Sequence, residues 1–416
     1  YVVIATTGGY FYTMTTSSNV FGAEYKGQSY QGFASDPHQH SGPLTVDITY
    51  GNSGDGINEQ RIALCTGYHE YDGATQNGLW KVLMPGDDTT GVNGETSNNF
   101  DQVGTTISHY QDQDDSNNNY RCGIKLSDDG TYVAVGDPNY KDPDTGHTVG
   151  VVYVYRQVRG WVTGPGVAWY PEQWRLVGTF TGHPEADELL GLDGTFDFGG
   201  LRKIFENGEI SREEVVRLAI RNKALGHASI WELDRVYTGD PFWIDNDLPE
   251  QEYYWEYSWN LVGEKTDNTG AKYSFDCGTG MAGITLSLSG NQMVCSTNTD
   301  ADGDGFDEAS FKVAFYDETN DEWTDDTTRF LNPNDDRSEI SFLAEDNIAK
   351  THTYSANDRD ILTDGVDAPQ LTQNGKRLAL SYDYGNTDVW YWNDFPYNRQ
   401  KGDDINYYNQ RHLPLN

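Results

Sequence analysis

The sequence predicts an all-β fold, a β-propeller of about six four-stranded blades, with seven as the alternative count. Three observations predict it: a segment of about 60–85 residues that recurs along the chain, a regular register of strand centres within the copies, and a composition suited to strands and turns. The 416 residues include 45 Gly, 28 Tyr, 16 Phe and 11 Trp. Aromatic and β-branched residues favour strands, and Gly, Asn and Asp favour tight turns.

The clearest copy of the repeat spans residues 99–155. It reads NFDQVG, RCGIKLSDDG, TYVAVGDP and GVVYVY, which we interpret as four strands, with SDDG as a tight turn between the second and the third. The first-strand pattern recurs at 174–178 and 259–263. The third strand reads RIALC, YVAVG, RLAI, QMVCS and RLALS in successive copies, with central residues Ala63, Ala134, Ala219, Val294 and Ala379.

The predicted blade units follow one another along the chain. They are 1–18, 19–98, 99–172, 173–256, 257–328 and 329–395, followed by a Tyr-rich tail at 396–416. The first unit is partial, because YVVIA resembles a third strand and GYFYTM a fourth. A blade completed by both chain ends closes a propeller ring and removes free edges. We therefore expect the tail to supply a closing strand or a contact between subunits.

One segment, 211–225, fits two structures. It reads SREEVVRLAIRNKAL and carries a capping box, Ser211 with Glu214, ahead of apolar residues at helical spacing. Taken alone it is an amphipathic helix. In the register of the repeat, however, VVRLAI occupies the place of a third strand. We expect a strand there, with a short helical insertion as the alternative.

The net charge restricts the partners. Acidic residues number 65 against 28 Lys and Arg, a formal net charge of −37. Nucleic acid is excluded as a partner, because phosphate backbones require Lys and Arg. A solvated acidic surface or several divalent-cation sites would each account for the charge. No run of 18 or more apolar residues occurs, so no transmembrane segment is expected.

The chain is expected to be secreted. It contains neither an initiating Met nor a signal peptide, which suggests a leader that was removed or left out. Its cysteines are Cys65, Cys122, Cys277 and Cys295. Such a sparse, even number suits one or two disulfides in an oxidising space, and buried free thiols are the alternative. No C-x-x-C spacing points to a zinc or redox site.

The repeat resembles a known family. The pattern W-x-L-V-G … G-x-x-L-S-x-x-G-x-x-V-A-V-G … G-x-V-x-V-Y is similar to FG-GAP-type repeats, the blades of integrin-α-like propellers, and most of all to the long-unit version in extracellular proteins of algae and marine microbes. It covers most of the chain and is clearest in the units 99–172 and 257–328. The Phe-Gly pair that gives the family its name is replaced by Cys122-Gly123 and Cys277-Gly278 and is retained as Phe198-Gly199. The resemblance implies a propeller, often calcium-loaded, used in adhesion, recognition or assembly.

The strongest candidate site is the segment DADGDGFDE. Its carboxylates stand at loop positions 1, 3, 5 and 9, with Gly at position 6 and a backbone carbonyl at position 7. Ca²⁺ requires six to eight oxygen ligands, which alternating Asp residues on a tight loop supply. The loop follows a third strand, where FG-GAP blades carry their calcium loop. The candidate ligands are Asp300, Asp302, Asp304, Phe306 and Glu308. A weaker acidic loop contains Asp137, Asp142 and Asp144.

The remaining clue to function is a set of aromatic residues. Two segments between blades and the tail are rich in Trp and Tyr, as expected of an interface or a sugar-stacking surface. These residues are Trp161, Trp169, Tyr170, Tyr253, Tyr254, Trp255, Tyr407 and Tyr408.

We expect no enzyme, because neither G-x-S-x-G nor G-x-x-x-x-G-K occurs. The predicted function is an extracellular structural or adhesive module, a self-assembling subunit of a surface layer or filament, with extracellular proteins or glycans as other partners. A lectin-like carbohydrate-binding propeller and a glycan-active enzyme are the alternatives.

Overall fold

The computed structural model divides the chain into two compact units. The first unit is Tyr1–Asp193 with Glu232–Asn260, and the second is Gly194–Trp231 with Leu261–Asn416. The described residues are 2–5, 10–16, 23–31, 40–41, 44–52, 58–71, 74–85, 100–108, 122–128, 130–158, 161–162, 169–170, 173–183, 190–191, 194–199, 204–206, 209–212, 216–222, 224–238, 255–278, 283–287, 289–299, 308–325, 330–331, 370–371, 377–381 and 387–392.

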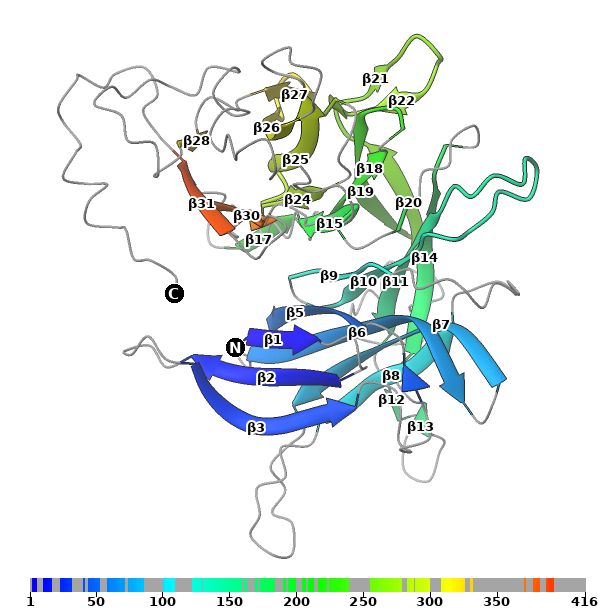
Figure 1. Ribbon diagram of the computed structural model, residues 1–416. Helices are drawn as coiled ribbons and strands as arrows, with labels where there is room; N and C mark the ends of the chain where they lie inside the picture. Colours follow the sequence, from blue (N-terminus) through cyan, green and yellow to red (C-terminus); the bar gives the residue numbers. More distant parts are fainter. Residues whose placement is uncertain are drawn as a thin grey trace, which may run out of the picture. The chain divides into compact units, whose positions relative to one another are not determined.

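The predicted all-β fold is confirmed. The described residues form antiparallel sheets, five of which are built on a path of four strands, and contain no helix (Figure 1). Accordingly, nothing in the described part is a helix long and apolar enough to cross a membrane.

In the first unit, the main sheets have the strand orders β1-β2-β3, β5-β6-β7-β8 and β9-β10-β11-β14. In addition, β4 pairs with β6, and β12 pairs with β13. The strands are β1 (Val2–Ala5), β2 (Tyr10–Thr16), β3 (Ala23–Gln31), β4 (His40–Ser41), β5 (Leu44–Asn52), β6 (Asn58–Tyr71), β7 (Ala74–Pro85), β8 (Phe100–Ser108), β9 (Ile124–Leu126), β10 (Tyr132–Asp137), β11 (Val151–Val158), β12 (Trp161–Val162), β13 (Trp169–Tyr170) and β14 (Gln173–Thr181).

In the second unit, the main sheets have the orders β15-β18-β19-β20, with β23 also beside β19, then β24-β25-β26-β27, and β29-β30-β31-β28. Strands β19 and β20 each contain residues of both units. The strands are β15 (Phe196–Gly199), β16 (Ile204–Glu206), β17 (Glu209–Arg212), β18 (Arg217–Asn222), β19 (His227–Tyr237), β20 (Trp255–Leu261), β21 (Lys265–Thr266), β22 (Lys272–Tyr273), β23 (Phe275–Asp276), β24 (Ile284–Leu286), β25 (Gln292–Thr299), β26 (Glu308–Asp317), β27 (Glu322–Asp325), β28 (Phe330–Leu331), β29 (Gln370–Leu371), β30 (Arg377–Ser381) and β31 (Thr387–Trp392).

The predicted third strands are confirmed as β6, β10, β18, β25 and β30. Each lies inside its sheet between two partner strands. Their central residues also share one register with the preceding strand. The pairs are Asp47↔Ala63, Lys125↔Ala134, Asp197↔Ala219, Thr285↔Val294 and Gln370↔Ala379. The repeat detected in the sequence is therefore a structural repeat.

The sheets are offset from the sequence copies by one strand. Strand β8, which opens the unit 99–172, pairs with β7 of the preceding copy, and β14, which opens the unit 173–256, pairs with β11. Each of these sheets thus combines the second to fourth strands of one copy with the first strand of the next. The tail, 396–416, lies outside the described residues.

The segment 211–225 contains a strand and not the alternative helix. Residues 217–222 form β18, which lies between β15 and β19. From Arg217 to Arg221 every residue is buried, whichever face of the strand it occupies. A helix of this sequence would expose its charged face, whereas a central strand pairs along both edges. The tertiary pairing therefore overrides the local helical pattern.

The same contacts join two consecutive sheets in each unit. In the first unit, the Leu126 amide donates to Asp47 Oδ2 (2.7 Å) and Arg61 Nη1 donates to the Gly130 carbonyl (2.7 Å). In the second unit, the equivalent donors and acceptors form the same bonds. They are Leu286 N to Asp197 Oδ2 (2.9 Å) and Arg217 Nη1 to Gly290 O (3.0 Å). We call each Asp–Arg set an inter-sheet clamp.

The clamp arginines reach a repeated turn. Gly130 and Gly290 have φ values of 67° and 66°, a conformation that favours glycine. Each amide donates to a serine carbonyl three residues earlier, Ser127 in the first unit and Ser287 in the second, at 2.8 Å. The SDDG turn predicted between the second and third strands is therefore present, and its copy SLSG has the same geometry.

Two hydrophobic clusters of the described residues lie between sheets, and each contains a disulfide. All four cysteines are paired, as Cys65–Cys122 and Cys277–Cys295, with Cα–Cα distances of 6.2 and 6.1 Å. The first disulfide lies among Trp80, Trp174 and their neighbours, and the second lies beside Trp323. The predicted disulfides are thus confirmed, and the alternative of free thiols is wrong.

Candidate functional site

The predicted calcium loop connects two paired strands. Its central part, with Asp300, Asp302, Asp304 and Phe306, lies outside the described residues, and its last member, Glu308, begins β26. Strands β25 and β26 pair without interruption up to Thr299↔Glu308. The backbone pairing therefore brings the two ends of the loop, Thr299 and Glu308, together. This placement suits a loop that gathers several oxygen ligands.

The aromatic candidates have different surroundings. Trp161 and Tyr170 are backbone partners in the short pair β12–β13, which also contains Trp169. Trp255 begins β20 and is 7% exposed, so it is a core residue rather than a loop residue. The others, Tyr253, Tyr254, Tyr407 and Tyr408, lie outside the described residues.

The weaker acidic loop folds as a hydrogen-bonded hairpin. Asp142 Oδ1 accepts hydrogen bonds from the Asp144 amide (2.9 Å) and from the amide (2.8 Å) and hydroxyl (3.0 Å) of Thr145. These bonds hold the pKa of the Asp142 carboxyl below its usual range. Asp142, a candidate metal ligand in the sequence, therefore stabilises its own turn.

Asp137 is a buried acid at the end of β10. Its side chain is 2% exposed, and its Oδ1 accepts a hydrogen bond from the Asn139 amide at 3.0 Å. Burial raises the pKa of Asp137 to about 7, because removal from water penalises the charged form more than the hydrogen bond from the Asn139 amide favours it. Asp137 therefore makes folding less favourable as its carboxyl ionises.

Asp137→Asn is expected to change the pH dependence of stability. The folded-state pKa lies above the unfolded one, so the wild-type protein loses stability as pH rises from about 4 to 7. One pKa unit corresponds to about 1.4 kcal/mol. The free energy of unfolding of the variant, relative to that of the wild type, should therefore rise by at least about 1 kcal/mol between pH 4.5 and pH 8. Urea unfolding at both pH values measures this.

The control for that prediction is Asp142→Asn. Its folded-state pKa is lowered, so its charge stabilises the fold at neutral pH and the substitution should destabilise the protein at pH 8. Parallel pH profiles for Asp137→Asn and wild type would contradict the assignment.

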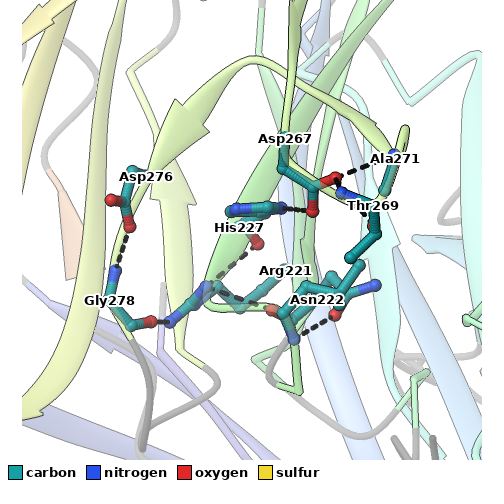
Figure 2. A network of polar contacts seen from close by, with 9 residues as sticks. Arg221, Asn222, His227, Asp267, Thr269, Ala271, Asp276 and Gly278 are labelled. Atoms are coloured by element: carbon teal, nitrogen blue, oxygen red, sulfur yellow. Dashed lines mark hydrogen bonds and ion pairs between the residues drawn. The ribbon is translucent and has the colours of Figure 1, made fainter.

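A polar network in the second unit surrounds His227 (Figure 2). Arg221, 1% exposed, donates from Nη1 to the His227 carbonyl (2.9 Å) and from Nη2 to the Gly278 carbonyl. The Gly278 amide in turn donates to Asp276 Oδ1 at 2.9 Å. One buried guanidinium thus joins the start of β19 to the segment that follows β23.

The His227 ring fastens the hairpin β21–β22. It stacks on Tyr273, with centroids 3.9 Å apart and planes 11° apart, and its Nδ1 lies 3.8 Å from Asp267 Oδ2. Asp267 Oδ1 accepts from the Thr269 hydroxyl (2.7 Å) and the Ala271 amide (2.9 Å) in the hairpin turn. The carboxylate therefore links the turn to the histidine.

Electrostatics favour a neutral ring at this position. Burial lowers the pKa of His227, while the carboxylates of Asp267 and Asp276 act in the opposite direction and Arg221 reinforces the lowering. The Thr269 hydroxyl is the largest of the contacts that lower the pKa of Asp267. A neutral His stacked on Tyr273 and an ionised Asp in a turn form a structural anchor.

The network was missed in the sequence, where His227 was one of nine scattered histidines. Its members are separated by up to 57 residues along the chain, so no local spacing reveals it. Within the described ranges, no group of three or more His, Cys, Asp or Glu side chains could hold a metal ion.

Comparison with protein-family models and with curated proteins found no match to this chain.

Proposed function

We propose that the chain is a β-propeller of the FG-GAP type, and that it serves as an extracellular, non-catalytic structural or adhesive module whose copies assemble into a layer or filament. The observation that carries the proposal is the recurrence of contacts between consecutive sheets. A ring of blades requires each sheet to meet the next in the same way.

Two further contacts support this arrangement. Trp174 Nε1 donates to the Val103 carbonyl (2.9 Å), and Trp259 Nε1 donates to the Val177 carbonyl (3.0 Å). Each joins the outer strand of one sheet to the outer strand of the sheet before it. The sheets that contain β6 and β10 are joined both by a clamp and by the Trp174 contact.

The two disulfides support an extracellular location, since disulfides persist in oxidising environments. The acidic loop between the paired strands β25 and β26 supports Ca²⁺ as the cofactor. The net charge of −37 also means that most of the surface attracts cations and repels anionic partners.

Calorimetry tests the calcium site. Wild-type protein freed of metal by a chelator should bind Ca²⁺, and Asp302→Ala should lose that heat, because it removes a central ligand. Asp144→Ala is the matched control: it removes one exposed carboxylate from the hairpin in the first unit and should leave the heat unchanged. No heat in the wild type would overturn the calcium proposal.

Electron microscopy of the native material tests assembly. We expect ordered filaments or layers in the presence of calcium. Dispersed monomers at high concentration, combined with strong selective hits on a glycan array, would replace the structural proposal with the lectin-like alternative.

A further inference from the structure

Strand β10 ends on an Asp-Pro peptide bond, between Asp137 and Pro138. A hydrogen-bonded ring closes around this bond, because Asp137 Oδ1 accepts from the amide of Asn139, the residue after the proline, at 3.0 Å. The main-chain carbonyl oxygen of Asp137 accepts a hydrogen bond from the Tyr140 amide at 3.4 Å. One turn thus holds the carboxyl group against the peptide bond and directs a backbone donor to the carbonyl oxygen of that bond.

The surroundings of this bond are buried. Asp137, Pro138 and Asn139 are all buried, and Asp137 is 2% exposed. The backbone of Gly191 lies against the end of β10, since a Cβ atom on Gly191 would come within 2.8 Å of the Asp137 amide nitrogen. Such a site favours the protonated, uncharged form of a carboxyl group.

The ionisable side chains around Asp137 do not offset its charge. Tyr153 of β11 interacts with it, and the pKa of Tyr153 is raised to about 12, mainly by burial and further by the charges of Asp137 and Tyr140. The backbone segments beside this end of β10, at 123–124 and 190–191, carry no ionisable side chain. Burial therefore raises the pKa of Asp137 to about 7, and its carboxyl group is largely protonated in mild acid.

We propose that the chain cleaves itself at the Asp137–Pro138 bond in mildly acidic solution. A protonated aspartic acid can attack the carbonyl carbon of its own residue. Proline suits this reaction, because its nitrogen belongs to a tertiary amide and leaves readily once it accepts a proton. The inference adds an activity to the proposed function and does not depend on assembly.

The reaction is a hydrolysis in two stages. A side-chain oxygen of Asp137 bonds to the main-chain carbonyl carbon of the same residue, the bond from that carbon to the Pro138 nitrogen breaks, and the carboxyl proton passes to the departing nitrogen. The products are a five-membered cyclic anhydride at Asp137 and a secondary amine at Pro138. Solvent water then opens the anhydride to two carboxyl groups, so one water is consumed and nothing is oxidised.

The fold favours the first stage. Nucleophile and carbonyl belong to one residue, so the attack requires no encounter between separate groups. The Tyr140 amide donates to the oxygen on which negative charge develops during the attack. The strands stay together afterwards, because β10 and β11 pair from Tyr132↔Arg156 to Asp137↔Val151.

A second Asp-Pro bond in the same connection, between Asp142 and Pro143, is an internal control. Asp142 Oδ1 likewise accepts from the amide after the proline, that of Asp144, at 2.9 Å, and the Asp142 carbonyl accepts from the Gly146 amide at 2.8 Å. In contrast to the first bond, Pro143 is exposed, and the Thr145 amide is the largest of the contacts that hold the pKa of Asp142 below its usual range. An ionised carboxylate has no proton to give to the leaving nitrogen, so this bond should stay intact.

The test is incubation of the folded full chain at pH 5.5 and at pH 8, followed by mass spectrometry of denatured samples. We expect two fragments, residues 1–137 and 138–416, which separate without a reducing agent because each disulfide lies within one fragment. Cleavage should be about tenfold faster at pH 5.5, since the protonated fraction of a group with a pKa of about 7 is about tenfold larger there. Unfolding in urea at pH 5.5 removes the burial and should abolish the cleavage.

Three variants locate the reaction. Asp137→Asn removes the carboxyl group and Pro138→Ala removes the tertiary amide, so each should slow the cleavage at least about tenfold. Pro143→Ala makes the matched change at the second bond and should leave the rate unchanged. Circular dichroism checks that each variant folds, and if one of the first two fails to fold, the other decides.

Several results would overturn the proposal. A wild-type chain that stays intact at pH 5.5 would do so, and so would equal cleavage at the two Asp-Pro bonds, which is ordinary acid lability. Cleavage that protease inhibitors prevent would assign the break to a contaminant. Cleavage that begins only below about pH 4, where an exposed aspartic acid becomes protonated, would remove the role of burial.

Discussion

Arg217→Met is expected to lower the free energy of unfolding by about 3 kcal/mol. Arg217 is 5% exposed and donates from Nη1 to the Gly290 carbonyl (3.0 Å) and to Asn291 Oδ1 (2.6 Å). Its Cζ also lies 4.6 Å from the Tyr316 ring centroid. Methionine keeps the apolar stem of the side chain, so the loss measures the charged hydrogen bonds and the ring contact, not a cavity.

The equivalent substitution in the first unit, Arg61→Met, supplies the internal comparison. Arg61 is 6% exposed and donates to the Gly130 carbonyl and to Gln157 Oε1. If the inter-sheet clamps are equivalent, the two substitutions should cost similar amounts. Urea unfolding gives the totals, and hydrogen exchange shows where protection is lost.

Loss of protection should be local. Arg217→Met should release amides of β24 and β25, whereas Arg61→Met should release amides of β9 and β10. Arg217→Lys keeps the charge but not the planar fork, so it should give an intermediate cost. A change below about 0.5 kcal/mol in either methionine variant, the level of an ordinary surface substitution, would contradict the role of the clamps.

The repeat could be found in the sequence because its signal is local. Third strands pair on both sides, so both faces are buried and the short apolar runs around Ala63, Ala134 and Val294 stand out. The offset between sheets and copies had no such signal. Whether the pattern at 174–178 completes the preceding sheet or opens the next is decided by pairing with β11, which local residues do not encode.

The clamp arginines also have a signal in the sequence. The third-strand runs that contain Ala63, Ala219 and Ala379 begin with arginine, whereas the runs between them begin with Tyr132 and Gln292. The first two of these arginines, Arg61 and Arg217, are the clamp donors. The acidic loop could be proposed as a calcium site because its candidate ligands lie within nine residues. Arg156 and Tyr257, in contrast, are hydrogen-bonded although they lie about a hundred residues apart along the chain, so only the structure reveals their contact.

Removal of the disulfides should have an unequal effect. In the chain-entropy account, a crosslink stabilises the fold by restricting the unfolded chain, and the effect grows with the loop that it closes. The sequence separations are 57 for Cys65–Cys122 and 18 for Cys277–Cys295. The expected losses at 25 °C are therefore about 4 and about 3 kcal/mol.

Alanine is the suitable replacement for these cysteines, because all four are at most 1% exposed and serine would place a hydroxyl in an apolar core. The double variant Cys65→Ala with Cys122→Ala should unfold at a lower urea concentration than Cys277→Ala with Cys295→Ala. The backbone at the second disulfide is also held by a hydrogen bond, in which the Cys277 amide donates to the Gly226 carbonyl at 2.9 Å. The reverse order of stability would mean that native packing around the crosslinks, rather than restriction of the unfolded chain, determines what each disulfide contributes.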